Sequence, residues 1–373
     1  MTSEGHKKHA AIERPDLGQF GRYELGILGA PCSVIHSLVE QCAEQLSSMK
    51  LTYVDADHQE SNPSKYLNLT DKIKFHRWDY DRPLNSFDRK ILLSESDVLL
   101  VNTNHFPARR QIVICHEKKR ESLQRKLDRL TDVGLILLAP EVEQPYPFLE
   151  NVIQKYKPEV LQLDDAEAIG QWIKADYHSH LPKVKGLVLA GGKSQRMGKN
   201  KATLAYHGVS QLEYAFQAMN SLGIETFVSC RRDVDDYPEQ FPRVYDTFDG
   251  LGPFGAILSA FRQDPNAAWL VTAIDQPLLS SKELNFLLSQ RNASKMATCF
   301  HNPETGFPEP LITLWEPKSY QRLLSFLALG YSCPRKVLIN SEIYEIHVED
   351  TTFMKNANTP EERSIIQKLI QET

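Results

Sequence analysis

Twice in this chain, a buried apolar strand leads through glycine into a helix-like stretch, and this recurrence constrains the fold most. The first segment is YELGILGA at residues 23–30, and the second is VKGLVLAGG at residues 184–192. Strands that alternate with helices build parallel sheets covered by helices. Because 373 residues exceed what one core usually holds, we expect two α/β domains.

The remaining apolar runs fit one α/β series in each half of the chain. The predicted strands of the first half are 51–57, 97–103, 111–115 and 134–140, with a helical stretch over 117–130 and a closing helix from 164. Those of the second half are 225–230, 268–274, 310–315 and 341–348. A polar connector near Pro182 separates the halves. We expect two three-layer domains: a P-loop-like domain over 20–181 and a Rossmann-like domain over 182–373.

Charge and composition exclude several classes of partner. The net charge of −5 provides no global positive field for nucleic acid or an anionic membrane. The six cysteines are scattered, without metal-ligand spacing, which is typical of reduced thiols. Residues 1–20 lack the apolar core of a secretory signal, and apolar runs fall short of the ~20 residues that span a bilayer. We expect a cytoplasmic protein with no nucleic-acid or membrane partner.

The second glycine turn has the composition of a phosphate-binding loop. Gly191 and Gly192 permit positive φ and bring backbone N–H groups close to an anion. Arg196 and Lys201 add positive charge for phosphate oxygens. A tight turn with solvated basic residues is the structural alternative. The segment lacks the G-x-x-x-x-G-K-[ST] pattern of a Walker A loop.

The segment LVLAGGKSQRMGKNKATL resembles the L-A-G-G-x-S-x-R-M-G-x-D-K signature of the molybdenum cofactor guanylyltransferases, the MobA-type nucleotidyltransferases. The resemblance covers residues 184–373. Further matching segments follow in the family's order: Asp246 before Gly252-Pro253, IDQP at 274–277, PLITL at 310–314, Arg335-Lys336, and NANTPEE at 356–362.

The resemblance implies transfer of GMP from GTP to molybdopterin, with Mg²⁺ as cofactor and pyrophosphate as product. It implies nucleotide contacts from Leu189, Ala190, Gly191, Gly192, Lys201, Asp246 and Asp275, with Arg196 near the triphosphate. It also places Mg²⁺ on Asp275 and the acceptor near Arg335, Asn356 and Asn358. Arg196, Lys201 and Asp275 are the expected catalytic residues. GTP and molybdopterin are the expected small-molecule partners, and molybdoenzymes or their chaperones are candidate protein partners.

The residues themselves support part of this assignment. Asp275 ends an apolar strand, and ligands of open parallel sheets bind outside the carboxyl ends of strands. A carboxylate there suits Mg²⁺. Asp275 and Asp246 also fit ordinary turns. The purely structural interpretation of residues 356–362 is a helix capping box, in which Thr359 is the N-cap and Glu362 closes the box. Asn356 and Asn358 could either bind the acceptor or form Asx turns, and both interpretations stay open. Arg335 could likewise contact the acceptor phosphate or be a solvated surface residue.

No Ser/His/Asp or Cys/His nucleophile set is evident, and none is needed if the acceptor phosphate attacks the α-phosphorus directly. Departures from the family pattern include Asn200, Ser229 and Ile274. Gly191 favours guanine, because cytidylyltransferase relatives usually carry L-A-A-G. The alternatives are a related nucleotidyltransferase that uses CTP or acts on a sugar phosphate, and a noncatalytic scaffold for cofactor insertion.

The first glycine turn lacks the residues of a phosphate grip. Counted from Gly29, a Walker A loop would need Gly, Lys and Ser/Thr where Val34, Ile35 and His36 stand. The layout over residues 20–180 otherwise resembles the MobB-type accessory GTPases. We expect a degenerate domain that neither binds nor hydrolyses nucleotide strongly. The group Asp55, Asp57 and His58 is interpreted as a polar strand end in preference to a metal cluster.

Overall fold

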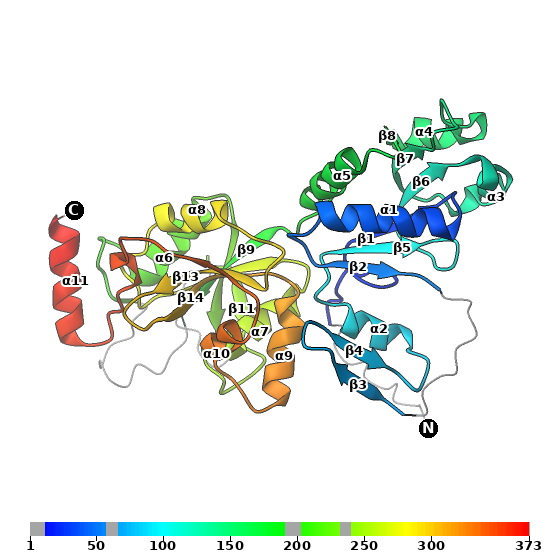
Figure 1. The fold of residues 1–373 in the computed structure, drawn as a ribbon. Coiled ribbons are helices and arrows are strands. Elements are labelled where there is room, and N and C mark those ends of the chain that lie inside the picture. The colour runs from blue at the N-terminus through cyan, green and yellow to red at the C-terminus, as the bar shows by residue number, and fades with distance from the viewer. Residues whose placement is uncertain (1–11, 57–65, 191–202, 232–239, 373) are drawn as a thin grey trace, which may run out of the picture. The chain divides into compact units, whose positions relative to one another are not determined.

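The computed structural model describes residues 12–56, 66–190, 203–231 and 240–372 (Figure 1). The chain forms two compact units that divide between Leu181 and Pro182. One unit runs from Asp16 to Leu181, and the other from Pro182 to the C-terminus together with the residues before Asp16. Each unit is built from strands that alternate with helices, so the expected α/β class is confirmed. None of the helices that the structure describes could span a membrane.

The N-terminal unit is built on a six-stranded sheet with parallel neighbours throughout. In order across the sheet, the strands are β2 (Leu51–Val54), β5 (Val98–Asn102), β1 (Glu24–Leu28), β6 (Arg110–Cys115), β7 (Val133–Leu138) and β8 (Glu159–Gln162). Strands β1, β5 and β7 are buried along their whole length. This matches the apolar runs in the sequence, because helices cover both faces of a parallel sheet.

Helices α1 (Cys32–Gln45) and α5 (Ala166–Ser179) cover one face of this sheet. Ile35, Leu38, Val39 and Cys42 of α1 are buried at helical spacing. The other face is covered by α3 (Arg120–Gln124), α4 (Glu150–Tyr156) and the 3₁₀ turns η2 (Leu127–Arg129) and η3 (Pro147–Leu149), and the short turn η1 (Glu117–Lys119) precedes α3. The remaining elements are a hairpin, β3 (Asn68–Asp71) and β4 (His76–Asp79), and the helix α2 (Ser86–Leu92).

One helix prediction in this unit is wrong. The charged stretch 117–130 contains two 3₁₀ turns and one short α-helix instead of a continuous helix. Only Leu123 and Leu130 are buried there. Helices depend on packing an apolar face, and two leucines bury too little surface to hold a long one.

The turn after β1 is short. Only Gly29, Ala30 and Pro31 separate β1 from α1. Gly29 has a φ of 92°, and a Cβ there would lie 2.2 Å from the Ile114 carbonyl oxygen, so glycine is required. Ile35, in the lysine position of a Walker A loop, is a fully buried core residue.

The C-terminal unit is built on a seven-stranded mixed sheet. Across the sheet, the strands are β11 (Arg243–Tyr245), β10 (Glu225–Cys230), β9 (Val184–Leu189), β12 (Ala268–Ala273), β14 (Phe307–Trp315), β13 (Ala297–Asn302) and β15 (Tyr344–Ile346). β14 is antiparallel to both neighbours, and the other pairs are parallel. The carboxyl ends of β9, β12, β13 and β15 therefore lie at one edge of the sheet.

Helices cover both faces of this sheet, so the three-layer expectation is confirmed. One core joins the sheet to α6 (Gln211–Asn220) and α8 (Ser281–Ser289). The other joins it to α7 (Pro253–Gln263), α9 (Ser319–Ala328) and α10 (Pro334–Ile339). The turn η5 (Thr352–Met354) and the helix α11 (Pro360–Glu372) complete the chain.

Candidate active site

The predicted glycine loop begins where the central strand β9 ends. Leu189 is the last residue of β9, and Leu189 and Ala190 are both buried. The Ile274 N–H donates to the Leu189 carbonyl oxygen at 3.4 Å, which joins the end of β9 to the residues after β12. The other predicted members of the loop, Gly191, Gly192, Arg196 and Lys201, lie outside the described residues.

The segment that follows the loop is fastened to the same edge of the sheet. His207 Nε2 donates to the Pro277 carbonyl oxygen at 2.8 Å, and its ring stacks on Tyr214 with centroids 3.9 Å apart. The guanidinium of Arg363 in α11 lies over the Tyr206 ring at 5.7 Å. Leu189 and His207 are therefore both held to residues just after β12.

Asp275 lies just beyond the carboxyl end of β12, where the sequence predicts a metal ligand. Its carbonyl oxygen accepts a 2.8 Å hydrogen bond from the Ala357 N–H. Asn356 and Asn358, which flank buried Ala357, have exposed side chains. The structure thus brings the predicted metal ligand and the predicted acceptor segment together, although they lie far apart in the sequence.

The capping-box prediction for this segment is confirmed. The Thr359 N–H donates to Glu362 Oε2 at 3.0 Å, and the Glu362 N–H donates to Thr359 Oγ1 at 3.2 Å. The Asn358 N–H also donates to Glu362 Oε2, at 2.6 Å. These bonds fix the backbone at the start of α11, directly after the exposed residues Asn356 and Asn358.

Sequence reasoning missed a second carboxylate at this edge, that of Glu309 in β14. Glu309 is 6% exposed and accepts hydrogen bonds from Asn302 Nδ2 at 3.2 Å and from the Leu311 N–H at 3.3 Å. Burial raises the pKa of the Glu309 carboxyl above its ordinary value, and the charge of Asp275 adds to that rise. These two hydrogen bonds and the charge of Arg335 act in the opposite direction. The sequence signal that could have identified this residue is a glutamate within the otherwise apolar strand PEPLITLW.

Arg335, in the first turn of α10, lies within electrostatic range of Glu309. Its charge acts on Glu309, and its Nε is a buried donor without a hydrogen-bond partner. Buried donors are normally paired, so an unpaired guanidinium nitrogen beside a site indicates a place for an anionic group. Lys336 lies differently, because its Nζ is 3.7 Å from the centroid of the exposed Tyr331 ring.

Asp246 lies on the other side of β9, just after the strand β11. Ser229 Oγ donates to Asp246 Oδ1 at 2.9 Å. Burial raises the Asp246 pKa, the Ser229 bond and the charge of Arg231 lower it, and the charge of Asp249 raises it. Ser229, noted in the sequence only as a departure from the family pattern, therefore holds the Asp246 carboxylate in place. The strand order places Asp246 and Asp275 on opposite sides of the central strand β9.

The donor set around Asp275 fits a hard divalent cation. Two carboxylates, those of Asp275 and Glu309, lie at this edge of the sheet, and the charge of Asp275 raises the pKa of Glu309. Buried like charges are unfavourable unless a cation neutralises them, and carboxylate oxygens are the ligands that hard cations prefer. A Rossmann-like sheet whose central strand β9 leads into the glycine-rich sequence, with Asp275 and Glu309 at the same edge of the sheet, is typical of a nucleotidyltransferase.

Comparisons with known proteins agree with this class. Residues 186–342 match the MobA-like NTP transferase domain. A molybdenum cofactor guanylyltransferase of Xanthomonas euvesicatoria pv. vesicatoria is 31% identical over 186 residues, which are 48% of this chain and 92% of that protein. The chain therefore belongs to the MobA-like NTP transferase family.

Two further proteins are similar. A molybdenum cofactor biosynthesis bifunctional protein of Synechocystis sp. is 32% identical over 179 residues, which are 48% of this chain and 52% of that protein. The match thus spans about half the length of that relative. The crystal structure of molybdopterin-guanine dinucleotide biosynthesis protein A from Archaeoglobus fulgidus is 21% identical, with a TM-score of 0.44, and covers 51% of this chain and 100% of that one.

Proposed function

We propose that this protein transfers GMP from GTP to the terminal phosphate of molybdopterin and releases pyrophosphate. The observation that carries the proposal is the backbone hydrogen bond between Asp275 and Ala357, in the segment 356–358. This hydrogen bond supports the proposal because it joins the backbone of the expected metal ligand to the segment that carries the candidate acceptor contacts. The guanylyltransferase and the bifunctional relative named above support this substrate pair.

In the proposed reaction, an oxygen of the acceptor phosphate attacks the α-phosphorus of GTP. A bond forms between that oxygen and the α-phosphorus, the bond from the α-phosphorus to the bridging oxygen breaks, and pyrophosphate leaves with the electron pair. The chain supplies no covalent nucleophile in this scheme. Its contribution is to align the two phosphates and to neutralise charge.

The chain's own residues divide this work. Leu189, Ala190, Gly191 and Gly192 would bring the backbone close to the nucleotide, with Arg196 and Lys201 on its phosphate oxygens. Asp246 would hold the nucleoside on one side of the loop. Arg335, through its unpaired Nε, would hold the acceptor phosphate on the other side, with Asn356 and Asn358 on the pterin. Asp275, beside Glu309, would hold Mg²⁺. When bound, that ion would neutralise the triphosphate.

We propose that the N-terminal unit does not hydrolyse nucleotide and serves the reaction in another way. Its turn after β1 has three residues, and the buried Ile35 stands in the place of the Walker A lysine. Asp55 accepts hydrogen bonds from Tyr53 at 2.6 Å and from Asn102 at 2.9 Å, which supports a polar strand end. Its predicted neighbours Asp57 and His58 lie outside the described residues.

A thermal-shift screen of the full chain separates the candidate functions. GTP, CTP, UTP and ATP are each added with Mg²⁺, and the unfolding temperature is measured. Ligands that bind only the folded state raise that temperature. Selective stabilisation by GTP supports the proposal. Selective stabilisation by CTP or UTP favours a related nucleotidyltransferase, and no response to any nucleotide favours a scaffold.

A further inference from the structure

A second group of potential metal ligands lies at the edge of the C-terminal sheet. His301 belongs to β13, Glu345 belongs to β15, and His347 follows β15 directly. The two strands pair in parallel, with Cys299 opposite Glu345 and Phe300 opposite Ile346. Side chains alternate between the faces of a strand, so this register puts His301, Glu345 and His347 on one face of the strand pair.

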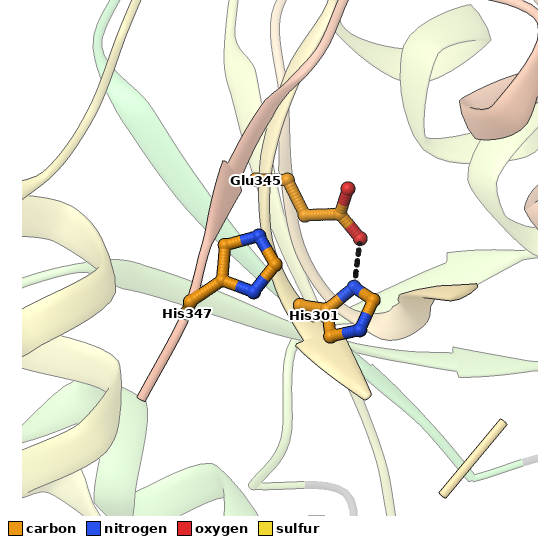
Figure 2. Close-up of side chains that lie close together, drawn as sticks. All are labelled: His301, Glu345 and His347. Atoms are coloured by element: carbon orange, nitrogen blue, oxygen red, sulfur yellow. Dashed lines mark hydrogen bonds and ion pairs between the residues drawn. The ribbon is translucent and has the colours of Figure 1, made fainter. Parts of the chain in front are cut away.

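The three side chains converge, as Figure 2 shows. His301 Nδ1 and Glu345 Oε1 are 2.8 Å apart, and the His301 and His347 rings stack with centroids 4.5 Å apart and an interplanar angle of 29°. One ligand atom from each residue lies within 4.8 Å of the other two. Four ligands around zinc are about 3.4 Å from one another if each bond is about 2.1 Å. Closing the site therefore takes side-chain movements of about an ångström.

These side chains have room for such movements. The His301 and Glu345 side chains are 25% and 29% exposed, and His347 is exposed. Solvent also reaches the cluster, so water can complete the coordination of a bound ion. We infer that His301, Glu345 and His347 form a binding site for a transition-metal ion of the Zn²⁺ class, because two imidazoles and one carboxylate are typical zinc ligands.

This site is separate from the cation site at Asp275. Both lie at the same edge of the sheet, but β14 and β13 come between β12 and β15. At about 4.8 Å per strand, the two sites are roughly 10 to 15 Å apart. Paired catalytic metals lie only about 4 Å apart. The ligand chemistry also differs, because the imidazoles at one site favour zinc, whereas the carboxylates at the other favour magnesium.

The ion would fasten the edge strand β15 to the sheet. β15 has three residues, and among the described strands it pairs with β13 alone, through Thr298, Cys299 and Phe300. A metal held by one residue of β13 and two residues at β15 would cross-link the two strands. Because the ion would bind the folded chain and not the unfolded one, it would raise the unfolding temperature of the C-terminal unit.

Calorimetric titration of the EDTA-treated full chain with ZnCl₂ tests the inference. We expect wild-type protein to bind an ion that the variants H301A, E345Q and H347A bind at least roughly tenfold more weakly. H36A is the matched control, because His36 also pairs with a carboxylate, Glu40, at 3.3 Å, but the described residues give this pair no third metal ligand. H36A should titrate like the wild type.

Two further readouts keep the test independent of folding and of the proposed transferase activity. Co²⁺ in place of Zn²⁺ should give a visible absorption band that H347A lacks, while GTP stabilises H347A and wild-type protein equally. His347 is exposed, so its removal should leave the fold intact. Equal Zn²⁺ affinity in wild type, H301A and H347A would overturn the inference, whether or not GTP binds.

Discussion

The Ala357 N–H donates a 2.8 Å hydrogen bond to the carbonyl oxygen of Asp275. Both partners are backbone groups, so the bond fixes the position of the chain on either side of Ala357 whatever the neighbouring side chains are. Asn356 and Asn358 are thereby held beside the carboxylate that we assign to the cation. This hydrogen bond joins the segment 274–277 to the segment 356–358, which are far apart in the sequence.

The first prediction concerns the two asparagines. N356A and N358A should each raise the KM for molybdopterin roughly threefold to tenfold, the cost of one side-chain hydrogen bond, and leave the Kd for GTP unchanged. The backbone bond to Asp275 survives both substitutions. N220A, at the exposed end of α6, is the control. A raised Kd for GTP with an unchanged KM for molybdopterin would show that the assignment to the acceptor is wrong.

A second prediction separates Arg335 from its neighbour. R335M should lower kcat/KM for molybdopterin roughly tenfold to a hundredfold, because a charged hydrogen bond to the acceptor is lost. K336M should have little effect, since Lys336 lies over the exposed Tyr331 ring. Steady-state kinetics on both variants provide the comparison. Equal losses in the two variants would contradict an acceptor role that is specific to Arg335.

A third prediction concerns the stability of the C-terminal unit. Arg291 holds Glu316 through two bonds, from Nε to Oε1 at 2.7 Å and from Nη2 to Oε2 at 2.8 Å, and Glu316 is 2% exposed. R291M leaves that carboxylate buried and unpaired, so we expect a loss of about 3 kcal/mol in the free energy of unfolding.

Urea unfolding of R291M and of a matched control checks this value. In K295M, only the partly exposed pair between Lys295 and Glu342 at 3.3 Å is broken, and the expected loss is at most about 1 kcal/mol. If R291M is no less stable than K295M, the buried pair does not contribute as argued.

The fourth prediction is a dependence of stability on pH that involves Asp246. Burial raises the Asp246 pKa in the folded chain. Its contribution to stability is therefore complete below the ordinary carboxyl pKa of about 3.8 and is lost as the pH rises through the raised value. D246N cannot ionise, yet it can still accept the Ser229 bond. The free energy of unfolding of D246N should therefore increase relative to that of wild type as the pH rises from 4 to 7.

Urea unfolding at both pH values measures that difference. S229A is a useful companion, because losing the bond that favours the ionised carboxylate should raise the Asp246 pKa further. A difference between D246N and wild type that stays constant with pH would contradict the raised pKa.

Much of the fold could be predicted because a buried strand is recognisable from its own run of apolar residues. Strands β1, β5 and β7 are apolar runs that both faces of a parallel sheet require. The hairpin of β3 and β4 was missed because its residues are mostly exposed and carry no apolar alternation. The broken helix over 117–130 was missed because periodicity alone does not reveal how little of its surface is buried.

Site residues could be predicted only where a single local sequence motif identifies them. Asp275 could be assigned because it follows an apolar strand directly. Glu309 could not, because its approach to Asp275 depends on the insertion of antiparallel β14 beside β12. The group of His301, Glu345 and His347 depends likewise on the register of β13 against β15. Sequence patterns indicate which segments are strands but not which strands become neighbours.

Pyrophosphate release tests the central claim most directly. The full chain is incubated with GTP, Mg²⁺ and molybdopterin, and pyrophosphate is measured for wild-type protein and for D275N, with unfolding temperatures as the control for folding. We expect release that requires molybdopterin and that falls on the order of a hundredfold or more in D275N. Equal release by both proteins, or equal release without molybdopterin, would contradict the account.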